Sequence, residues 1–433
     1  MKNAIAGSAQ DSSIAKPGIE RYQWLALISA FLGWMFDSMD LNLFTLVLFP
    51  SVSELIGNTN PAEVSRIGGL IMAIKLAAWG VGGILFGIAA DRYGRAKIMA
   101  LTIVIYSVFT GLSALSQSWE QLALFQALAG FGIGGEWAAG AALVAETWPT
   151  KYRARAIQIM QMAFAFGFFA AALSNLLLGS YGWRWVLAAG ALPVVITVVV
   201  RRFVKEPEKW VKVKQAELVE RAKGGPATST FREIFRGGLR RNTIVGVVIA
   251  SAAMVGCWGG LTLLPSWMQQ LSKASPGINP KDAISYAFML MMAGATLGYI
   301  TLIFLSDILG RRLCYFLFWS AALLSSLYLF TSVHSVTEVL WFMPVYGYFV
   351  IGGFGTFATY LPELFPTRVR ATGQGFCWNM ARVITAAGPL MVGALVHRFG
   401  SLPNAAAVVS LFIILGLVVV WFGPETKGVP LED

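Results

Sequence analysis

The chain has 433 residues, of which 57% are hydrophobic and only 13% are charged. Soluble domains contain about 25% charged residues, and charges are costly in hydrocarbon, so this composition favours a protein embedded in lipid. The net charge of +11 would suit a nucleic-acid binder, but the positions of the charges argue against that class. Cys257, Cys314 and Cys377 lie far apart in apolar segments, so we interpret them as small hydrophobic residues and not as metal ligands or a disulfide.

The predicted elements begin after a polar stretch, residues 1–23. It lacks the apolar core and the cleavage site of a signal peptide, so we expect a cytoplasmic tail. Apolar runs of about 20 residues, long enough to cross a bilayer, then follow one another. We predict twelve membrane-spanning helices, at 24–49, 66–90, 98–116, 121–146, 156–178, 184–201, 243–268, 283–305, 313–331, 337–361, 372–394 and 402–422. Glycine and proline interrupt the seventh and the tenth, which neighbouring helices can compensate.

The basic residues alternate between the loops. If the N-terminus is cytoplasmic, most of the 33 lysines and arginines fall in cytoplasmic segments. The outer loops then hold only Arg66, Arg184, Lys273, Lys281 and Arg398. Basic loops mark the cytoplasmic side, so we predict a multi-pass protein of a bacterial-type inner membrane with both termini in the cytoplasm. The positive charge is then a signal of topology, and we expect no nucleic-acid partner.

One long polar segment, 202–241, divides the twelve predicted spans into two sets of six. We predict an N-terminal bundle over 24–201, a cytoplasmic linker over 202–241, a C-terminal bundle over 242–422 and a cytoplasmic tail over 423–433. Within the linker, residues 207–222 either form an amphipathic helix on the anionic inner leaflet or serve as a plain tether.

An internal repeat relates the two predicted bundles. DRYGRAK at 91–97 matches DILGRRL at 307–313, and ETWPTKYRARA at 146–156 matches ELFPTRVRATG at 363–373. Each motif follows the second or the fourth helix of its bundle. The sequence therefore predicts an all-α membrane protein in which two six-helix bundles form a parallel repeat about an axis along the membrane normal.

The repeated loops carry candidate gating residues. Glycines 87 and 94 allow a tight turn between helices. Asp91 could pair with basic residues or with the N-terminus of a neighbouring helix, where the helix dipole favours an anion. Such contacts would lock the cytoplasmic side; simple anchoring of basic residues at the membrane is the alternative. The candidates are Gly87, Asp91, Arg92, Gly94, Arg95, Glu146, Arg153, Asp307, Arg311, Glu363 and Arg370.

These motifs resemble those of the major facilitator superfamily. The segment 87–97 resembles its signature loop, and the segments from Glu146 and Glu363 resemble those of its sugar-porter and metabolite:proton symporter branches. The segments 206–210 and 424–432 are similar to the same branches. The resemblance covers essentially the whole chain and implies a secondary active transporter that works by alternating access.

The first and fourth predicted helices resemble one group more closely. Asp37-x-x-Asp40 is similar to an element of the aromatic-acid and sialic-acid symporters, as is the glycine-rich segment 130–137. Two positions depart from the pattern. Gln126 stands where that group usually has an arginine, and Ile303 stands where the second loop motif would have a glycine.

Charged residues inside the predicted spans are functional candidates, because a charge there costs about 2.5–3.5 kcal/mol or more unless it is paired or hydrated. Asp37 and Asp40 share one face of the first helix. Two close carboxyls in a low-dielectric site favour proton uptake by one of them, so we predict proton coupling at both. Pairing with a basic group, or capping of a kinked helix, is the alternative. Glu136 is a third candidate proton carrier or a structural hydrogen-bonding residue.

Arg382, in the eleventh predicted helix, is the candidate anchor for an anionic substrate, because a guanidinium binds a carboxylate through two hydrogen bonds. A structural ion pair with Asp37 or Asp40 is the alternative. Asn379, three residues earlier, faces the same way. Lys75 gives a second positive contact or extends to the membrane interface. The other predicted substrate-binding residues are Trp378, Trp34 and Gln126, and Trp137 and Trp258 are further aromatic candidates.

We therefore expect proton-coupled uptake of a small organic anion, such as an aromatic acid, a sugar acid or another carboxylate. A carrier of neutral sugars or cyclitols, or an exporter of cationic compounds, is the alternative. The only histidines, His334 and His397, lie near predicted outer loops, and no metal or nucleophile motif occurs in the spans. We expect no catalytic residue, metal or cofactor, and a monomer in contact with membrane lipids.

Overall fold

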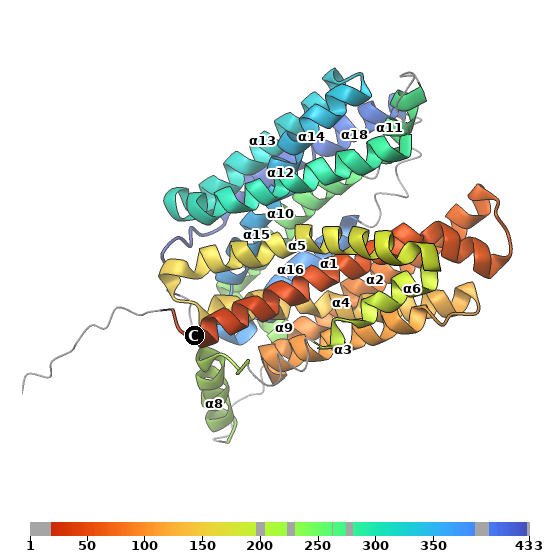
Figure 1. Cartoon of the computed structure of the whole chain (residues 1–433). Coiled ribbons are helices and arrows are strands. Elements are labelled where there is room, and N and C mark those ends of the chain that lie inside the picture. The colour runs from red at the N-terminus through yellow and green to blue at the C-terminus, as the bar shows by residue number, and fades with distance from the viewer. Residues whose placement is uncertain are drawn as a thin grey trace, which may run out of the picture.

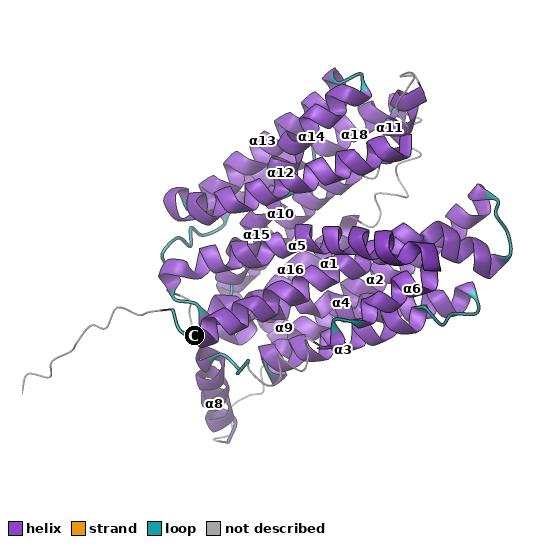
Figure 2. Cartoon of the chain, in the orientation of Figure 1, coloured by secondary structure: helices purple, strands orange, loops and turns teal. Residues whose placement is uncertain are grey.

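The computed structural model describes residues 19–195, 204–222, 230–261, 263–273, 280–385 and 398–430. In these ranges the chain is helical and contains no strand (Figure 2). Ten of its helical stretches are long and apolar enough to cross a membrane. They coincide with ten of the twelve predicted spans. The other two predictions, 184–201 and 372–394, extend into residues outside the described ranges.

Six helices form the described part of the first half, which lies in the lower part of Figure 1. They are α1 (Arg21–Ile56), α2 (Pro61–Tyr93), α3 (Arg95–Ser113), α4 (Trp119–Thr147), α5 (Thr150–Leu178) and α6 (Trp183–Ala188). Glu20 and Gln23 form a capping box that starts α1, and Gly57 ends it in a left-handed conformation (φ 63°).

The second half contains nine described helices, and two more belong to the linker. Those of the second half are α10 (Gly237–Leu261), α11 (Leu264–Lys273), α12 (Pro280–Leu309), α13 (Arg311–Ser332), α14 (Val336–Val350), α15 (Gly355–Glu363), α16 (Arg370–Thr385), α18 (Leu402–Ser410) and α19 (Ile413–Val419). The tenth predicted span is divided into α14 and α15 by a 3-10 turn at Gly352–Phe354. In the linker, α8 (Glu208–Ala222) and α9 (Thr230–Glu233) are helical.

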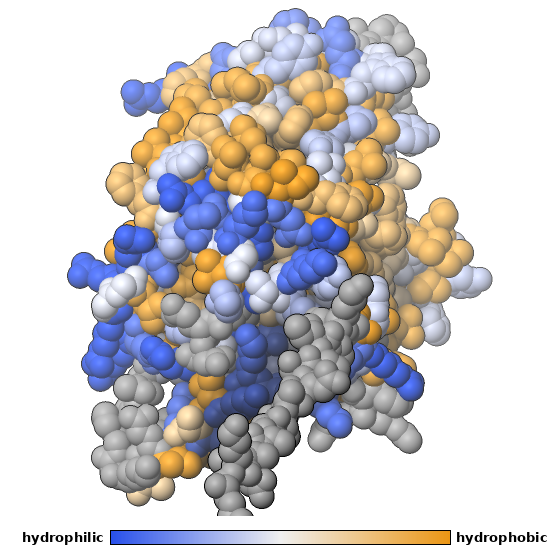
Figure 3. Space-filling model, turned by 90° about the vertical axis from the view of Figure 1, so that its left-hand side faces the viewer, coloured by the Kyte–Doolittle hydropathy of each residue, from blue (hydrophilic) through white to orange (hydrophobic). Residues whose placement is uncertain are grey.

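The helix α8 projects from the end of the bundle at which α1 begins (Figure 1). Figure 3 views this end face-on and shows hydrophilic residues gathered across its middle. Of the two alternatives for residues 207–222, the helical one agrees with α8, and contact of this helix with lipid stays a prediction.

The glycines of α4 allow α2 and α3 to pack closely against it. A Cβ atom on Gly134 would overlap the backbone of Trp79 and Gly83 in α2, and one on Gly132 would approach Tyr106 of α3 at 2.7 Å. Membrane helices associate through such small residues because lipid gives no hydrophobic drive between helices. The close approach fixes α4, and with it Glu136, at the centre of the first half.

Alanine at position 134 is expected to lower the free energy of unfolding by about 1–3 kcal/mol, the usual cost of overpacking. The added Cβ must push α2 away, because the atoms it meets are backbone. Thermal unfolding of the purified protein measures the effect. Gly69→Ala in α2 is the control, since a Cβ there meets no atom within 4 Å, and equal midpoints for the two variants would refute the packing argument.

The two halves meet along α2 and α16 and along α5 and α12. Gln374 of α16 donates a hydrogen bond to the Ala138 carbonyl oxygen (2.5 Å), and Gln158 of α5 donates one to the Gly355 carbonyl oxygen (2.6 Å). Phe168 of α5 stacks on Phe288 of α12, with ring centroids 6.2 Å apart. These contacts bring α4 and α16, which carry several predicted site residues, side by side.

Candidate transport site and gate

Two buried carboxyls, those of Asp37 on α1 and Glu136 on α4, face each other. Glu136 reaches α1 over Gly33, one turn before Asp37, where a Cβ atom would overlap its carboxyl. Apart from each other, the two carboxyls have no hydrogen-bond partner among the described residues. Two carboxylates that face each other in a low-dielectric site repel one another when both are ionised. The structure thus pairs Asp37 with Glu136, whereas the sequence suggested Asp40.

Asp40 has a different environment, because Lys75 of α2 neutralises it. The Lys75 Nζ and Asp40 Oδ2 atoms are 2.9 Å apart, and both side chains are buried. The Thr110 hydroxyl of α3 donates to the other carboxylate oxygen. This is the pairing with a basic group that we considered as the alternative for Asp40. Lys75 neither extends to the membrane interface nor lies free beside a substrate, since its amine is held inside the first half.

Gln126 of α4 is buried and donates a hydrogen bond to the Ser113 hydroxyl (3.0 Å). Ser113 lies one turn after Thr110 on α3, so the Gln126 amide is close to the Asp40 ion pair. In this conformation Gln126 is a neighbour of that pair and does not contact Arg382.

Arg382 on α16 is held by aromatic and amide groups. Its guanidinium lies 3.8 Å from the ring centroid of Trp79 and 5.5 Å from that of Trp378. It donates a hydrogen bond to Asn379 Oδ1 (3.1 Å), so the two predicted substrate-binding residues do lie together. Among the described residues no carboxylate lies within ion-pair distance of it. The guanidinium is thus oriented while its charge remains available.

Sequence reasoning missed Trp79, which supplies the ring beneath Arg382. Trp79 lies one turn after Lys75 in the same predicted span, and this position could have suggested that it lies near the site. The aromatic candidates Trp34, Trp137 and Trp378 form a row. Trp137 and Trp378 stack across the two halves with centroids 4.7 Å apart, and Trp34 lies 6.4 Å from Trp137.

Trp258 on α10 is 37% exposed and has no ring contact with this row among the described residues. The structure therefore joins three of the four tryptophans named from the sequence and leaves the fourth apart.

A charge network joins the halves near the loop at 91–97. The Asp91 carboxylate accepts hydrogen bonds from the backbone N–H groups of Ala371 (3.1 Å) and Thr372 (2.7 Å), in the first turn of α16. It also pairs with Arg95 at 2.9 Å. Asp91 therefore uses both kinds of partner that the sequence suggested, a basic residue and the N-terminus of a neighbouring helix.

The network continues across the interface. Glu146 of α4 pairs with Arg95 (3.0 Å) and with Arg370 of α16 (2.8 Å), and all three side chains are buried. Gly87 makes this approach possible, because a Cβ there would lie 2.8 Å from the Ala371 carbonyl oxygen. Gly94 has φ 118° at the start of α3, a conformation that favours glycine.

The repeated motif builds an equivalent network in the second half. Arg311 pairs with Glu363 (2.9 Å) and more loosely with Asp307 (3.7 Å). Arg153 of the first half lies 3.7 Å from Glu363, so this network also crosses to the other half.

Arg92 behaves differently from these gating candidates. It is exposed against the Tyr93 ring and has no ion pair among the described residues, which fits anchoring better than gating.

Sequence reasoning assigned no role to two glutamates that cap helices at this end. Glu206 accepts hydrogen bonds from the backbone of Ala96 and Lys97 at the start of α3. Glu425 accepts them from the backbone of Arg311 and Arg312 at the start of α13. Partial burial acts to raise the pKa of Glu425, but these N–H donors outweigh it and lower the pKa below its usual value.

Glu206 and Glu425 each follow the last predicted span of a half. The shared Glu and Pro residues of segments 206–210 and 424–432 could have suggested this common role from the sequence.

Arg370→Gln is expected to open this end of the protein. It removes a partner of buried Glu146, and breaking a buried ion pair costs about 3–5 kcal/mol in the state that contains it. Spin labels on cysteines at Lys151 and Ile308, exposed at this end of each half, would report the opening as a longer distance. Arg92→Gln, which removes an exposed arginine of the loop at 91–97 that has no ion pair among the described residues, is the control. Unchanged distances in Arg370→Gln would show that the network does not hold the halves together.

The fold and these sites define a multi-pass membrane transporter whose two halves meet around buried charges. Residues 24–389 match the Major Facilitator Superfamily model, and the chain belongs to that family. It is accordingly a transporter and not an enzyme.

Three similar proteins extend the comparison. A "Probable 4-methylmuconolactone transporter" of Cupriavidus pinatubonensis is 32% identical over 93% of this chain and 90% of its own length. A cis,cis-muconate transport protein of Acinetobacter baylyi is 30% identical over 96% of this chain and 98% of its own. The solved structure of the proton:xylose symporter XylE has a TM-score of 0.77 at 18% identity, covering 95% of this chain and 98% of that one. This last likeness concerns the fold.

Proposed function

We propose that the protein couples proton movement to the uptake of a small organic anion, such as an aromatic acid, a sugar acid or another carboxylate. One observation carries the proposal. Arg382, oriented but without a carboxylate partner among the described residues, lies beside Trp378, whose ring stacks on Trp137, the residue that follows Glu136 in α4. An arginine that attracts an anion then stands next to a pair that can exchange a proton.

The two charges complement each other during transport. A carboxylate that binds Arg382 neutralises the guanidinium, and the stacked Trp137 and Trp378 rings offer an apolar neighbour for the rest of the substrate. Uptake of a proton by the Asp37–Glu136 pair neutralises the negative charge of that pair. With both neutral, the halves can rearrange around the site at a lower electrostatic cost.

We place the protein in a bacterial-type inner membrane with both termini in the cytoplasm. The distribution of basic residues between loops supports this orientation. The Asp91–Glu146–Arg370 network is then the cytoplasmic gate, closed in this conformation. The proposed bundle limits, 24–201 and 242–422, follow from the same loops, and a monomer suffices because the candidate site lies within one chain.

Similarity to proteins named for the transport of muconate and of a muconolactone supports an organic acid as substrate. The test is uptake into proteoliposomes containing the purified protein, with cis,cis-muconate and benzoate as labelled substrates and their neutral amides as controls. An inward proton gradient should drive accumulation of a carboxylate but not of its amide. Uptake of neutral sugars or cyclitols without competition by carboxylates, or export of cations, would replace the proposal with its alternatives.

A further inference from the structure

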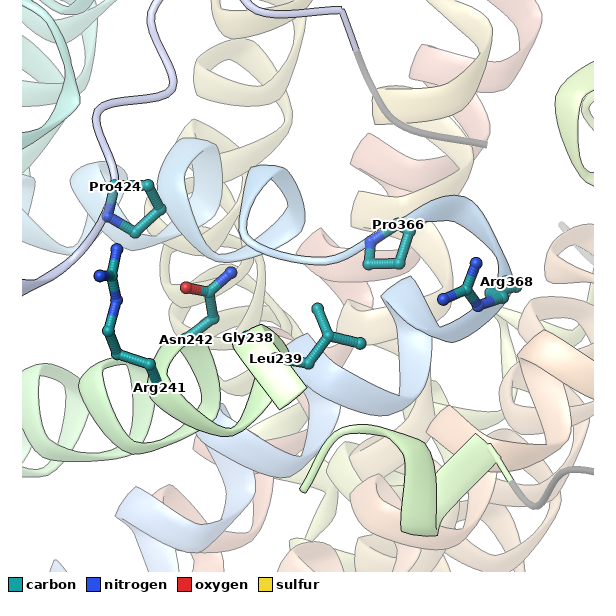
Figure 4. A pocket seen from close by; sticks show the side chains of 7 residues that line it. All are labelled: Gly238, Leu239, Arg241, Asn242, Pro366, Arg368 and Pro424. Atoms are coloured by element: carbon teal, nitrogen blue, oxygen red, sulfur yellow. The ribbon is translucent and has the colours of Figure 1, made fainter. Parts of the chain in front are cut away.

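A cavity of about 540 Å³ opens where the first turn of α10 meets the C-terminal segment and the 3-10 turn at Thr367–Val369. Arg241 and Arg368 lie at its two ends, with Asn242 and Leu239 between them and Pro424 beside Arg241 (Figure 4). Arg368 is paired with Glu233 of α9, so one of the two guanidinium groups is already neutralised. The Arg241 guanidinium has no ion pair among the described residues.

A second cavity of about 510 Å³ adjoins the first and shares Arg241. Its lining has a different character. Arg240 lies with Arg241 on one part of it, while Ile244, Val419 and Phe422 supply an apolar wall. The side chains of Ile244 and Phe422 are exposed, at 51% and 64%. Arg241 therefore stands at the boundary between a polar cavity and an apolar one.

The position of the two cavities along the membrane-spanning part matters. The candidate span of α10 begins at Gly237, and the span that contains α19 ends at Phe422. Both cavities therefore lie where the apolar part of the second half ends. Exposed arginines beside an apolar groove at this depth complement a molecule with a negative head and a hydrocarbon tail.

We propose that these two cavities form a binding site for an anionic phospholipid. Its phosphate contacts the guanidinium groups of Arg240 and Arg241, and an acyl chain lies against Ile244, Val419 and Phe422. The apolar wall favours a lipid over a free phosphate, which would use only the polar part. In the orientation proposed above, the lipid belongs to the inner leaflet, where anionic headgroups meet basic residues.

The experiment measures thermal unfolding of the purified full-length protein in detergent, with phosphatidylglycerol, with phosphatidylcholine, or with soluble glycerol 3-phosphate. Phosphatidylglycerol should raise the midpoint of the wild type, and the other two should not. Arg240→Gln/Arg241→Gln should lose most of that rise. Lys97→Gln/Lys151→Gln, which removes two exposed positive charges from the first half, should keep it.

A conservative variant separates charge from fold. Arg240→Lys/Arg241→Lys should retain a partial rise in midpoint, because lysine keeps the charge but not the forked donor geometry. An equal rise in the glutamine variant and the wild type would overturn the site. A rise with glycerol 3-phosphate equal to that with the lipid would replace it with a soluble-anion site. An equal rise with phosphatidylcholine would show that the headgroup charge has no role.

Discussion

Arg382→Lys is expected to lower carboxylate uptake by about 10- to 100-fold, the equivalent of losing a charged hydrogen bond worth about 1.5–3 kcal/mol. Lysine keeps the positive charge, but it cannot donate two parallel hydrogen bonds to a carboxylate or stack flat on the Trp79 ring, 3.8 Å from the present guanidinium. The loss should appear mainly as a higher substrate concentration for half-maximal uptake, measured in proteoliposomes.

A matched control exists in the same half. Arg312 also stacks on a tryptophan, Trp421, at 5.0 Å, but it lies in the first turn of α13, next to Arg311 of the gate network. Arg312→Lys should therefore leave carboxylate uptake close to that of the wild type. If Arg382→Lys transports carboxylates as well as Arg312→Lys does, Arg382 is not the anion anchor.

Asp37→Asn and Glu136→Gln are each expected to abolish proton-driven accumulation. Either change leaves one buried carboxyl facing a neutral amide, and without a second carboxyl to share its proton this carboxyl stays neutral in the low-dielectric site. The pair then no longer exchanges a proton during the transport cycle. Exchange of labelled for unlabelled substrate across the membrane, which needs no net proton movement, should persist in both variants.

The control for Glu136→Gln is Glu120→Gln, an exposed glutamate in the first turn of the same helix α4. It should keep both accumulation and exchange. Accumulation by Asp37→Asn at the wild-type level would remove the proposed proton carrier, and loss of exchange as well as accumulation would point to damage to the substrate site itself.

Much of the fold could be predicted from the sequence because a membrane constrains it strongly. Hydrocarbon requires long apolar helices, so composition alone located ten spans that the structure describes. The glycine-rich segment 130–137 of α4 is typical of a helix that packs closely against a neighbour. The glycines could not show that the neighbours are α2 and α3, because a glycine indicates a close approach without indicating which helix makes it.

The partners of the buried charges were harder to predict. Spacing shows that Asp37 and Asp40 share a face of α1, but two residues three apart also diverge by part of a turn. That angle directs Asp37 toward Glu136 and Asp40 toward Lys75. The choice depends on how α2 and α4 are rotated against α1, and a single sequence does not contain that information.

The gate was more accessible to sequence reasoning because it is repeated. Glu146 and Glu363 occupy equivalent positions in the two halves. Each pairs with the first arginine of the helix after the 91–97 or 307–313 motif, α3 or α13, and each also lies close to an arginine of the other half. Only the crossing of these networks between halves required the structure. Arg92 lies in the same motif but is exposed, since it occupies the outer side of the turn.

The central claim is that one transport event carries an organic anion on Arg382 and a proton on the Asp37–Glu136 pair. Its most direct test is to add cis,cis-muconate, or the best carboxylate from the uptake screen, to lightly buffered proteoliposomes and record the external pH while the substrate enters. The predicted result is alkalinisation of the medium in step with uptake, absent in Asp37→Asn. Accumulation of the substrate with no change in external pH would contradict it.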